Sequence, residues 1–554
     1  NMTDNSSTPL LDAAKAATAN SEDSAEEVAK KFLKVACSTF EESEVGNDVD
    51  RLIKIGRSIS DLLKSDSTNI EASLELLVTN CEMLAKGLNC PKTRFGKTGL
   101  MISRVTCGGM RFQQAWGPAI QSMDQVSPEC QENVVKILKQ AIKFGINHIE
   151  TARGYGCSEL QLGVAFKQLF DEGFVKREDL IIQTKVNPSA TAKEFRETLE
   201  KSFSLLQLDY VDLFSFHGMN LDSHYDMLFN NGENGNLYDV IEEYVAAGKI
   251  RHVGFSTHGQ AELIKKFIVT NKFEYVNLHY HFFGSYTASG GGPFGGNIEN
   301  IRLCQERDMG VFIISPYDKG GRLYAPSRKL RNLCLPDLEP ITFGSLWLWM
   351  HEIHDEKKAP IHTIVCGSAR PSDMDEPVIA AMLLENETFR EKTLTVADRL
   401  TNAMKETLGA SWVDSWHVGL PNCYETKQGT NITNFVWAYN LIKSFGMVDF
   451  AIDRYSMCEA NKTKWDQNLS YWENVGKIGS IGWGYVPGNA IDPGHDYSNE
   501  LKNCPPKNVP VIVDALEFVH KTCGKEGKQS KRDPDYETAY DMRPWTAFPE
   551  RPAN

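Results

Sequence analysis

Between residues 91 and 394, short apolar runs alternate with stretches in which apolar residues recur every three or four positions. The short runs are typical of buried strands, and the longer stretches are typical of amphipathic helices, as in residues 132–144. Continuously apolar strands that alternate with helices indicate a parallel sheet covered on both faces. Eight such units predict an α/β fold, a closed (β/α)8 TIM barrel. The predicted strands are residues 105–109, 148–151, 180–185, 211–216, 252–255, 275–278, 311–315 and 362–366.

The segments on either side of this region have a different pattern. In residues 1–90, apolar residues such as Val28, Phe32 and Val35 recur at helical spacing, which predicts two or three amphipathic helices without catalytic chemistry. Residues 395–525 are expected to form a mainly helical domain. The remainder, residues 526–554, is charged and rich in proline, which favours an extended arm.

Composition narrows the class of protein. The 554 residues carry a net charge of -14, which argues against a general nucleic-acid-binding surface. No apolar run is long enough to span a membrane, and the first residues lack the pattern of a signal peptide. The 13 cysteines include no CxxC pair, which argues against zinc and disulfides. We therefore expect a soluble cytoplasmic protein; the alternative is an organelle such as a plastid, after removal of a transit peptide.

Four residues suited to proton transfer follow three successive predicted strands. Glu150 lies near the end of the second strand and Tyr155 follows it, Lys185 ends the third, and His217 follows the fourth. Each alone is compatible with packing or with a solvent-exposed charge. In a (β/α)8 barrel, however, active sites lie at the C-terminal ends of the strands, so this set is expected to meet at one mouth.

The motifs that flank these residues resemble the aldo-keto reductase family. RFGKTGLMISRVTCGGM begins the resemblance and CGSARPSDMDE ends it, with ETARGYG and SPYDKGG between them. The sequence is similar to the larger oxidoreductase-like branch with a C-terminal extension. The resemblance implies an aldo-keto-reductase-type barrel and a tetrad of Asp, Tyr, Lys and His. The matching residues here are Glu150, Tyr155, Lys185 and His217.

The tetrad suits carbonyl reduction, which needs a hydride on carbon and a proton on oxygen. Tyr155 would be the general acid, and the ammonium of Lys185 is expected to lower its pKa from a usual value of about 10. Glu150 would orient Lys185, and His217 would hydrogen-bond the substrate oxygen. Glu150 stands where most of the family has Asp, and we expect activity to be retained. Arg153 has two interpretations. It either lowers the pKa of Tyr155 or binds an acidic substrate, or it forms a surface salt bridge.

The resemblance also implies an NADP(H) site across the barrel mouth. No GxGxxG motif follows a strand, so a Rossmann site is not indicated. Arg370 suits a 2′-phosphate and favours NADP over NAD; the alternative is a surface charge. The residues expected at the carboxamide are Ser256, Thr257 and Asn277. Those expected at the phosphates are Ser315, Lys319, Gly320, Gly321, Gly367, Ser368 and Arg370.

Three further segments carry predictions. The Gly-rich residues 284–296 are interpreted as a flexible rim or lid, and the run LWLWM at 346–350 as a buried helix or a pocket wall. Residues 395–525 resemble a ferredoxin-like tail in outline. Cys423, Cys458, Cys504 and Cys523 are too far apart for the usual ligand spacing, so neither an iron–sulfur cluster nor a metal is expected.

Together these features predict an NADP(H)-dependent oxidoreductase that reduces an aldehyde or ketone to an alcohol. The alternative is a weak or inactive barrel that serves as a cofactor-binding structural or assembly subunit. The expected partner of the chain is a small carbonyl compound and not a nucleic acid. The N-terminal helices or the C-terminal arm are candidate docking elements for a protein.

Overall fold

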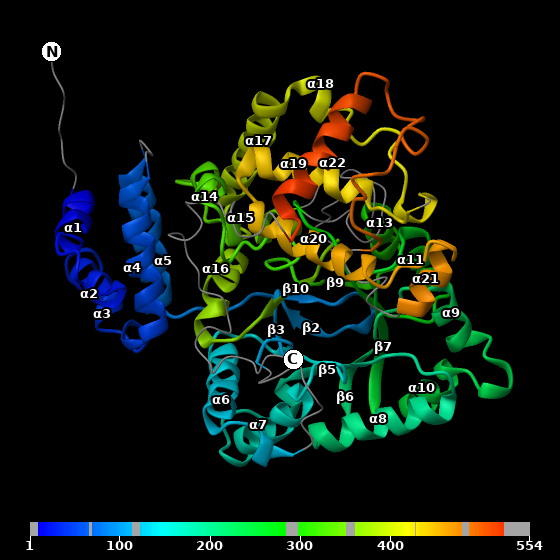
Figure 1. The fold of residues 1–554 in the computed structure, drawn as a ribbon. Coiled ribbons are helices and arrows are strands. Elements are labelled where there is room, and N and C mark those ends of the chain that lie inside the picture. The colour runs from blue at the N-terminus through cyan, green and yellow to red at the C-terminus, as the bar shows by residue number, and fades with distance from the viewer. Residues whose placement is uncertain are drawn as a thin grey trace.

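A closed barrel of eight parallel strands forms the centre of the computed structural model (Figure 1). The structure describes residues 9–65, 69–112, 122–283, 297–350, 360–426, 428–478 and 487–525. The last strand pairs with the first through Ile364 and Val105, which closes the barrel and confirms the predicted fold. Around the barrel the strands are β3 (Val105–Gly108), β4 (His148–Glu150), β5 (Ile181–Val186), β6 (Val211–Phe216), β7 (Ile250–Ser256), β8 (Tyr275–Leu278), β9 (Gly310–Ile313) and β10 (Thr363–Gly367).

Helices surround the barrel and cover the outer face of the sheet. Strand residues are buried almost throughout, as expected for a sheet covered on one side by helices and filled on the other by side chains. The helices that follow these strands are α6 (Pro128–Lys143), α7 (Ser158–Asp171), α8 (Ala192–Leu206), α9 (Asp222–Phe229) and α10 (Leu237–Ala246) after β6, α11 (Ala261–Ile268), α13 (Ile298–Glu306) and, after β10, α16 (Asp375–Leu383).

The N-terminal end of the barrel is closed by an antiparallel pair, β1 (Lys92–Arg94) and β2 (Met101–Ser103). Phe95, between these strands, is fully buried, and its ring centroid lies 5.4 Å from that of Tyr275 and 5.5 Å from that of His362. The opposite end, where the strands finish, is therefore the open mouth at which a site can form.

The insertion between β9 and β10 contains α14 (Arg328–Cys334) and α15 (Pro340–Trp349). Helix α15 includes most of the LWLWM run, with Leu346, Leu348 and Trp349 buried, and its first residues line the cavity described below. It is thus both a buried helix and a pocket wall. The expected lid at 284–296 and the expected arm at 526–554 lie outside the described residues.

The N-terminal segment forms α1 (Pro9–Ala17), α2 (Ala25–Ala36), α3 (Ser38–Glu41), α4 (Val49–Lys64) and α5 (Ile70–Lys86). Helix α2 starts at a capping box formed by Ser24 and Glu27, and its buried face includes Phe32. Val35 was expected on this apolar face, but it is 74% exposed. These helices stand beside the barrel, with α4 and α5 on its side (Figure 1).

The C-terminal helices lie over the mouth of the barrel rather than beside it. The indole of Trp437 donates to the carbonyl of Phe283 after β8 (2.7 Å), and Asp453 pairs with Arg322 after β9 (2.7 Å). The helices are α17 (Glu387–Leu408), α18 (Ala410–Val413), α19 (Ile432–Phe445), α20 (Val448–Lys462), α21 (Tyr471–Ile478) and α22 (Val509–Cys523).

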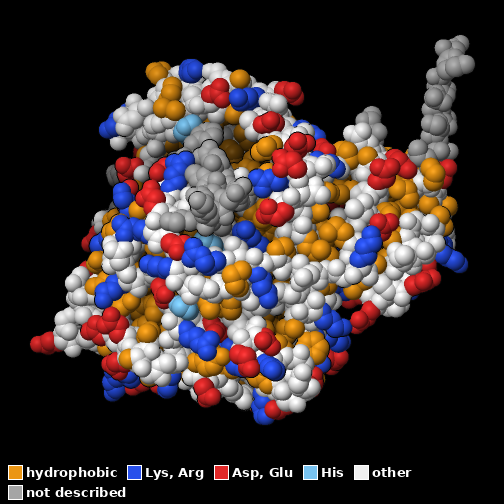
Figure 2. Space-filling model, turned by 180° about the vertical axis from the view of Figure 1, so that it is seen from behind, with side chains coloured by type: hydrophobic (Ala, Val, Ile, Leu, Met, Phe, Trp, Pro, Cys, Tyr) orange, Lys and Arg blue, Asp and Glu red, His pale blue; other side chains and the backbone are white. Residues whose placement is uncertain are grey.

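The cysteines, the surface charge and the helix lengths add three observations. All 13 cysteines are buried thiols, and the described residues contain no group of three or more His, Cys, Asp or Glu that could hold a metal. Acidic and basic side chains are interspersed over the face drawn in Figure 2. Within the described ranges, no helix is long and apolar enough to cross a membrane.

Candidate active site

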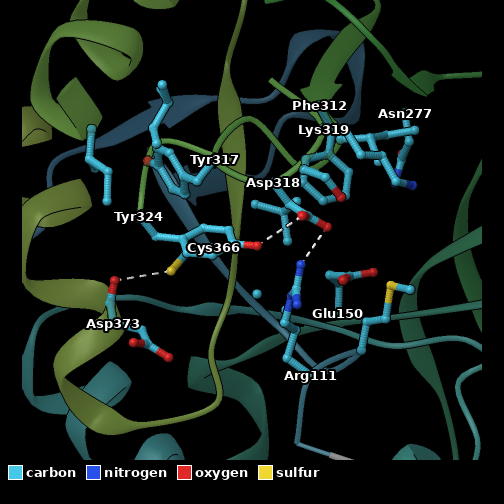
Figure 3. Close-up of a pocket in the computed structure, with 18 of the residues that line it drawn as sticks. Arg111, Glu150, Asn277, Phe312, Tyr317, Asp318, Lys319, Tyr324, Cys366 and Asp373 are labelled. Carbon is cyan, nitrogen blue, oxygen red and sulfur yellow. Dashed lines mark hydrogen bonds and ion pairs between the residues drawn. The ribbon is translucent and has the colours of Figure 1, made fainter. Parts of the chain in front are cut away.

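A cavity with a volume of about 230 Å³ opens at the C-terminal ends of the strands. Strand ends supply Glu150, Lys185, Ser256 and Asn277 to its wall, and the loop after β4 supplies Tyr155. Figure 3 shows part of this wall.

Glu150 and Lys185 form a buried ion pair at the bottom of the cavity. The ammonium of Lys185 donates to the carboxylate of Glu150 and to the carbonyl of Thr151 (2.8 Å). Both side chains are at most 5% exposed. Burial lowers the pKa of Lys185, and the contact with Glu150 acts in the opposite direction. The Glu150 side chain therefore reaches Lys185, as the proposed tetrad requires.

Tyr155 lies beside this pair. The Nζ atom of Lys185 lies over the Tyr155 ring, 4.8 Å from its centre, so the ammonium contacts the ring face. Burial raises the pKa of Tyr155 well above its usual value, and the charge of Glu150 adds to the rise. This direction corrects the sequence-based expectation of a lowered pKa: Glu150 balances the charge of Lys185, and burial disfavours the phenolate. Tyr155 is therefore a protonated phenol at neutral pH.

His217 completes the group, with its ring 5.5 Å from that of Tyr155 and nearly perpendicular to it. Burial lowers the pKa of His217 to about 3, and the charges of Lys185 and Lys319 contribute to the shift. The imidazole is thus neutral. Among the described residues its Nδ1 atom has no hydrogen-bond partner. A neutral phenol and a neutral imidazole, beside a charge-balanced Lys–Glu pair, can bind and protonate a carbonyl oxygen.

Of the three residues expected at the nicotinamide carboxamide, two line the cavity and one does not. Ser256 and Asn277 line the cavity, and the buried Oδ1 atom of Asn277 has no partner among the described residues. The hydroxyl of Thr257 instead donates to the carbonyl of Met219 (2.8 Å) and accepts from the amide of Gly259 (2.9 Å). Thr257 therefore stabilises the backbone and is not part of the described wall.

The loop after β9 makes a tight turn at the expected phosphate site. A Cβ atom on Gly320 would lie 2.0 Å from the carbonyl oxygen of Pro316, and Gly321 has φ +127°, so both positions require glycine. Ser315 and Lys319 line the cavity, while neither glycine is part of the described wall. Burial lowers the pKa of Lys319 to about 8, although Asp318 acts against the shift.

The segment after β10 differs from expectation. Gly367 lines the cavity, but Ser368 and Arg370 are buried and are not among the described lining residues. The guanidinium Nε of Arg370 lies 3.8 Å from the carboxylate of Asp373. Arg370 also acts on Asp50 of α4. Burial raises the pKa of Asp50, and the charge of Arg370 opposes that rise. Arg370 is thus held among side chains between α4 and the barrel, where it was expected to bind a 2′-phosphate.

Sequence reasoning missed the ion pair between Arg111 and Asp318, which crosses the cavity (Figure 3). Tyr324 donates to the same carboxylate (3.1 Å). Burial opposes ionisation of Asp318, but the charges of Arg111, Lys319 and Arg454 outweigh it and lower its pKa. Arg111 follows the first barrel strand, so the strand-end rule could have found it if applied to every strand.

A chain of three histidines, of which His279 and His281 are buried, was also missed. Nδ1 of His258 lies 2.5 Å from Nε2 of His279, whose Nδ1 lies 3.0 Å from Nε2 of His281. His258 is the member that lines the cavity. Burial lowers the pKa of His258 and His279 well below the usual value, so these rings are neutral. The alternating HYH after the sixth strand was the available signal.

Arg153 had two interpretations, and the structure supports the salt bridge. Its guanidinium pairs with the buried carboxylate of Glu159, which also accepts from the hydroxyl of Thr184 (2.6 Å). Arg153 is not among the described residues that line the cavity. It therefore positions the start of α7 below the loop that carries Tyr155.

Comparison with known proteins matches residues 104–322 to the model of the aldo/keto reductase family. Dihydrodiol dehydrogenase 3 of Bos taurus is 32% identical over 142 residues, which cover 24% of this chain and 44% of that protein. The NAD(P)H-dependent D-xylose reductase of Candida tenuis is also 32% identical over 142 residues, covering 23% and 44%. The chain thus spans less than half the length of these relatives. An aldo-keto reductase from Bacillus halodurans aligns over 56% of this chain and 96% of its own, with 18% identity and a TM-score of 0.41.

Proposed function

We propose that this chain is a member of the aldo/keto reductase family, whose model matches residues 104–322, and that it reduces an aldehyde or ketone to an alcohol with a nicotinamide dinucleotide as the hydride donor. The observation that carries the proposal is the meeting of Glu150, Tyr155, Lys185 and His217 at one end of a single cavity. Protonated Tyr155 and neutral His217 are the forms needed to donate a proton and a hydrogen bond to a carbonyl oxygen.

In the proposed mechanism the carbonyl oxygen lies near Tyr155 and His217. A nicotinamide bound there would supply the hydride for the carbonyl carbon; Tyr155 gives its proton to the carbonyl oxygen, which completes the alcohol. The charge that develops on the phenol oxygen is stabilised by Lys185, which Glu150 holds in place. In the reverse direction Tyr155 is the base.

The residues present fit a nicotinamide dinucleotide. The orphaned Oδ1 of buried Asn277 offers an acceptor to a carboxamide, and Ser315 and Lys319, which line the cavity after β9, are placed to meet a pyrophosphate. The sequence predicts NADP(H) rather than NAD(H), and that prediction depended on Arg370 binding the 2′-phosphate. The burial of Arg370 beside Asp373 removes that argument without weakening the argument for a dinucleotide.

The test is a fluorescence titration of the full chain with NADH and NADPH, followed by turnover of a panel of aldehydes and ketones. We expect saturable binding of at least one dinucleotide and oxidation of it that depends on a carbonyl compound. Tight binding without turnover of any panel member would support the structural-subunit alternative. Absence of binding to either dinucleotide would contradict both.

A further inference from the structure

Helix α4 of the N-terminal segment forms part of the wall of the cavity that contains Tyr155. Lys54, on α4, lines this cavity together with Asp373, in the turn before α16, and Glu376, in the first turn of α16. The ammonium of Lys54 pairs with the carboxylate of Glu376 at 2.7 Å. A residue far outside the segment matched to the family therefore meets the same ligand space as the tetrad.

Buried ion pairs hold α4 in this place. Arg51 donates to both carboxylate oxygens of Asp375, at 2.7 and 2.8 Å. Further along the helix, Asp61 accepts from Arg328 (2.8 Å) and from Arg331 (3.0 Å) on α14. Paired guanidinium and carboxylate groups of this kind have fixed geometry, so Lys54 is positioned rather than free to swing.

The end of the cavity at α4 is rich in carboxylates. Asp373, Glu376 and Glu339 line it, whereas Lys54 is the cation that α4 adds. Lys54 is balanced by Glu376, and Glu339 is balanced by Arg331 at 2.8 Å. Of the other nearby cations, Arg111 pairs with Asp318 and Arg370 is buried against Asp373. The wall at this end therefore has no excess of positive charge to offer a phosphate.

The position of the tetrad decides which part of a dinucleotide meets this wall. Hydride transfer requires the nicotinamide at the Tyr155 end, so an extended dinucleotide reaches toward the remaining wall with its adenosine half. A ribose 2′-hydroxyl there can donate to a carboxylate. A 2′-phosphate would instead lose hydration beside cations that already have carboxylate partners.

We propose that the cavity selects NAD(H) over NADP(H), with Glu376 and Lys54 as the specificity-determining pair. The proposal rests on the proposed function, because it assumes that the dinucleotide binds with its nicotinamide at Tyr155. It replaces the sequence-based expectation of NADP(H), and it gives the N-terminal segment a role in ligand choice.

The experiment titrates the full-length protein with NADH and with NADPH and follows nucleotide fluorescence, without any substrate. The wild-type protein should bind NADH more tightly by roughly tenfold or more, the lower end of what a hydrogen bond to a charged group contributes. Glu376→Gln should narrow the ratio and Lys54→Met should widen it. Glu387→Gln, an exposed carboxylate at the start of α17, is the control and should leave the ratio unchanged.

The outcomes separate this proposal from the proposed function. Failure to bind either dinucleotide overturns the proposed function. Equal or tighter binding of NADPH by the wild-type protein overturns the selection of NAD(H) and leaves the proposed function standing. A preference for NADH that neither Glu376→Gln nor Lys54→Met alters overturns the assignment to this pair. Because the wild-type ratio needs no variant, poor folding of either variant does not remove the test.

Discussion

The two ends of the cavity are built in different ways. At the Tyr155 end, consecutive barrel strands bring Glu150 and Lys185 together, and burial leaves Tyr155 and His217 neutral. At the α4 end, a helix from outside the barrel brings Lys54 to Glu376, and the charged groups are paired across two separate segments. The first end is suited to moving a proton, and the second is suited to choosing a ligand.

The difference shows how one barrel can keep its chemistry while its ligand changes. Strand-end side chains are fixed by the hydrogen-bonded register of the sheet, as in the pairing of Glu150 with Gln183 on β5. The α4 end depends on ion pairs such as Arg51 with Asp375, which can be altered without disturbing the barrel. Each prediction below perturbs one end and asks whether the other responds.

The largest effect is expected for Lys185→Met. Loss of the ammonium removes the charge that stabilises a developing phenolate, so turnover should fall by about 10²–10⁴-fold, the range for acid–base groups. It also leaves Glu150 buried and unpaired, which should destabilise the protein by about 3–5 kcal/mol. Turnover and urea unfolding measure the two effects.

The double variant Glu150→Gln/Lys185→Met is the control for Lys185→Met. It removes both charges and should recover most of the stability without recovering turnover. Recovery of turnover would contradict the role given to Lys185. Dinucleotide selectivity, which depends on the α4 end, should be the same in both variants.

A second effect is expected for Arg51→Met at the other end. The variant leaves Asp375 buried without its partner, and breaking a buried pair costs about 3–5 kcal/mol. The double variant Arg51→Met/Asp375→Leu should be closer to the wild type in urea unfolding. The ratio of NADH to NADPH affinity should change in Arg51→Met, because α4 loses an anchor, whereas Lys185→Met should leave it unchanged.

The smallest effect is a pH dependence of opposite sign at the two ends. The folded pKa of His217 is about 3, below its usual value near 6.5. Between these values the unfolded chain binds the proton and the folded chain does not, so stability falls as pH is lowered, by about 1.4 kcal/mol per pH unit for each such histidine. Burial raises the pKa of Asp375, so this group favours the folded state as pH falls.

Urea unfolding from pH 7 to pH 5 measures this dependence. His217→Asn should reduce the slope of the unfolding free energy against pH by the amount that corresponds to about one proton taken up on unfolding. Asp375→Asn should leave the slope unchanged or make it steeper. An equal slope in wild type and His217→Asn would contradict the neutral, buried state assigned to His217.

The barrel and its proton-transfer end were accessible to sequence reasoning for a physical reason. Strand-end positions in a barrel point to a common mouth, so His217 and Lys185 could be placed together from their spacing alone. The direction of the Tyr155 pKa could not be predicted, because it depends on burial and on how fully Glu150 balances Lys185.

The α4 end could not be predicted because its contacts join residues that are distant in sequence. Nothing near Lys54 in the chain indicates that it meets Glu376 more than 300 residues later. The environment of the Arg370 side chain could not be predicted for the same reason. Arg370 follows β10 as expected, but its side chain lies against Asp373 and α4. Tertiary packing of the flanking helices decides both.

The most direct test of the proposed function compares Tyr155→Phe with the wild type in a single turnover of bound, reduced dinucleotide with a carbonyl substrate. Tyr210→Phe, at the N-terminal end of β6, is the control. The account predicts unchanged dinucleotide affinity in all three proteins, and a rate reduced by about 10²–10⁴-fold only in Tyr155→Phe. A wild-type rate in Tyr155→Phe would contradict the assignment of Tyr155 as the general acid.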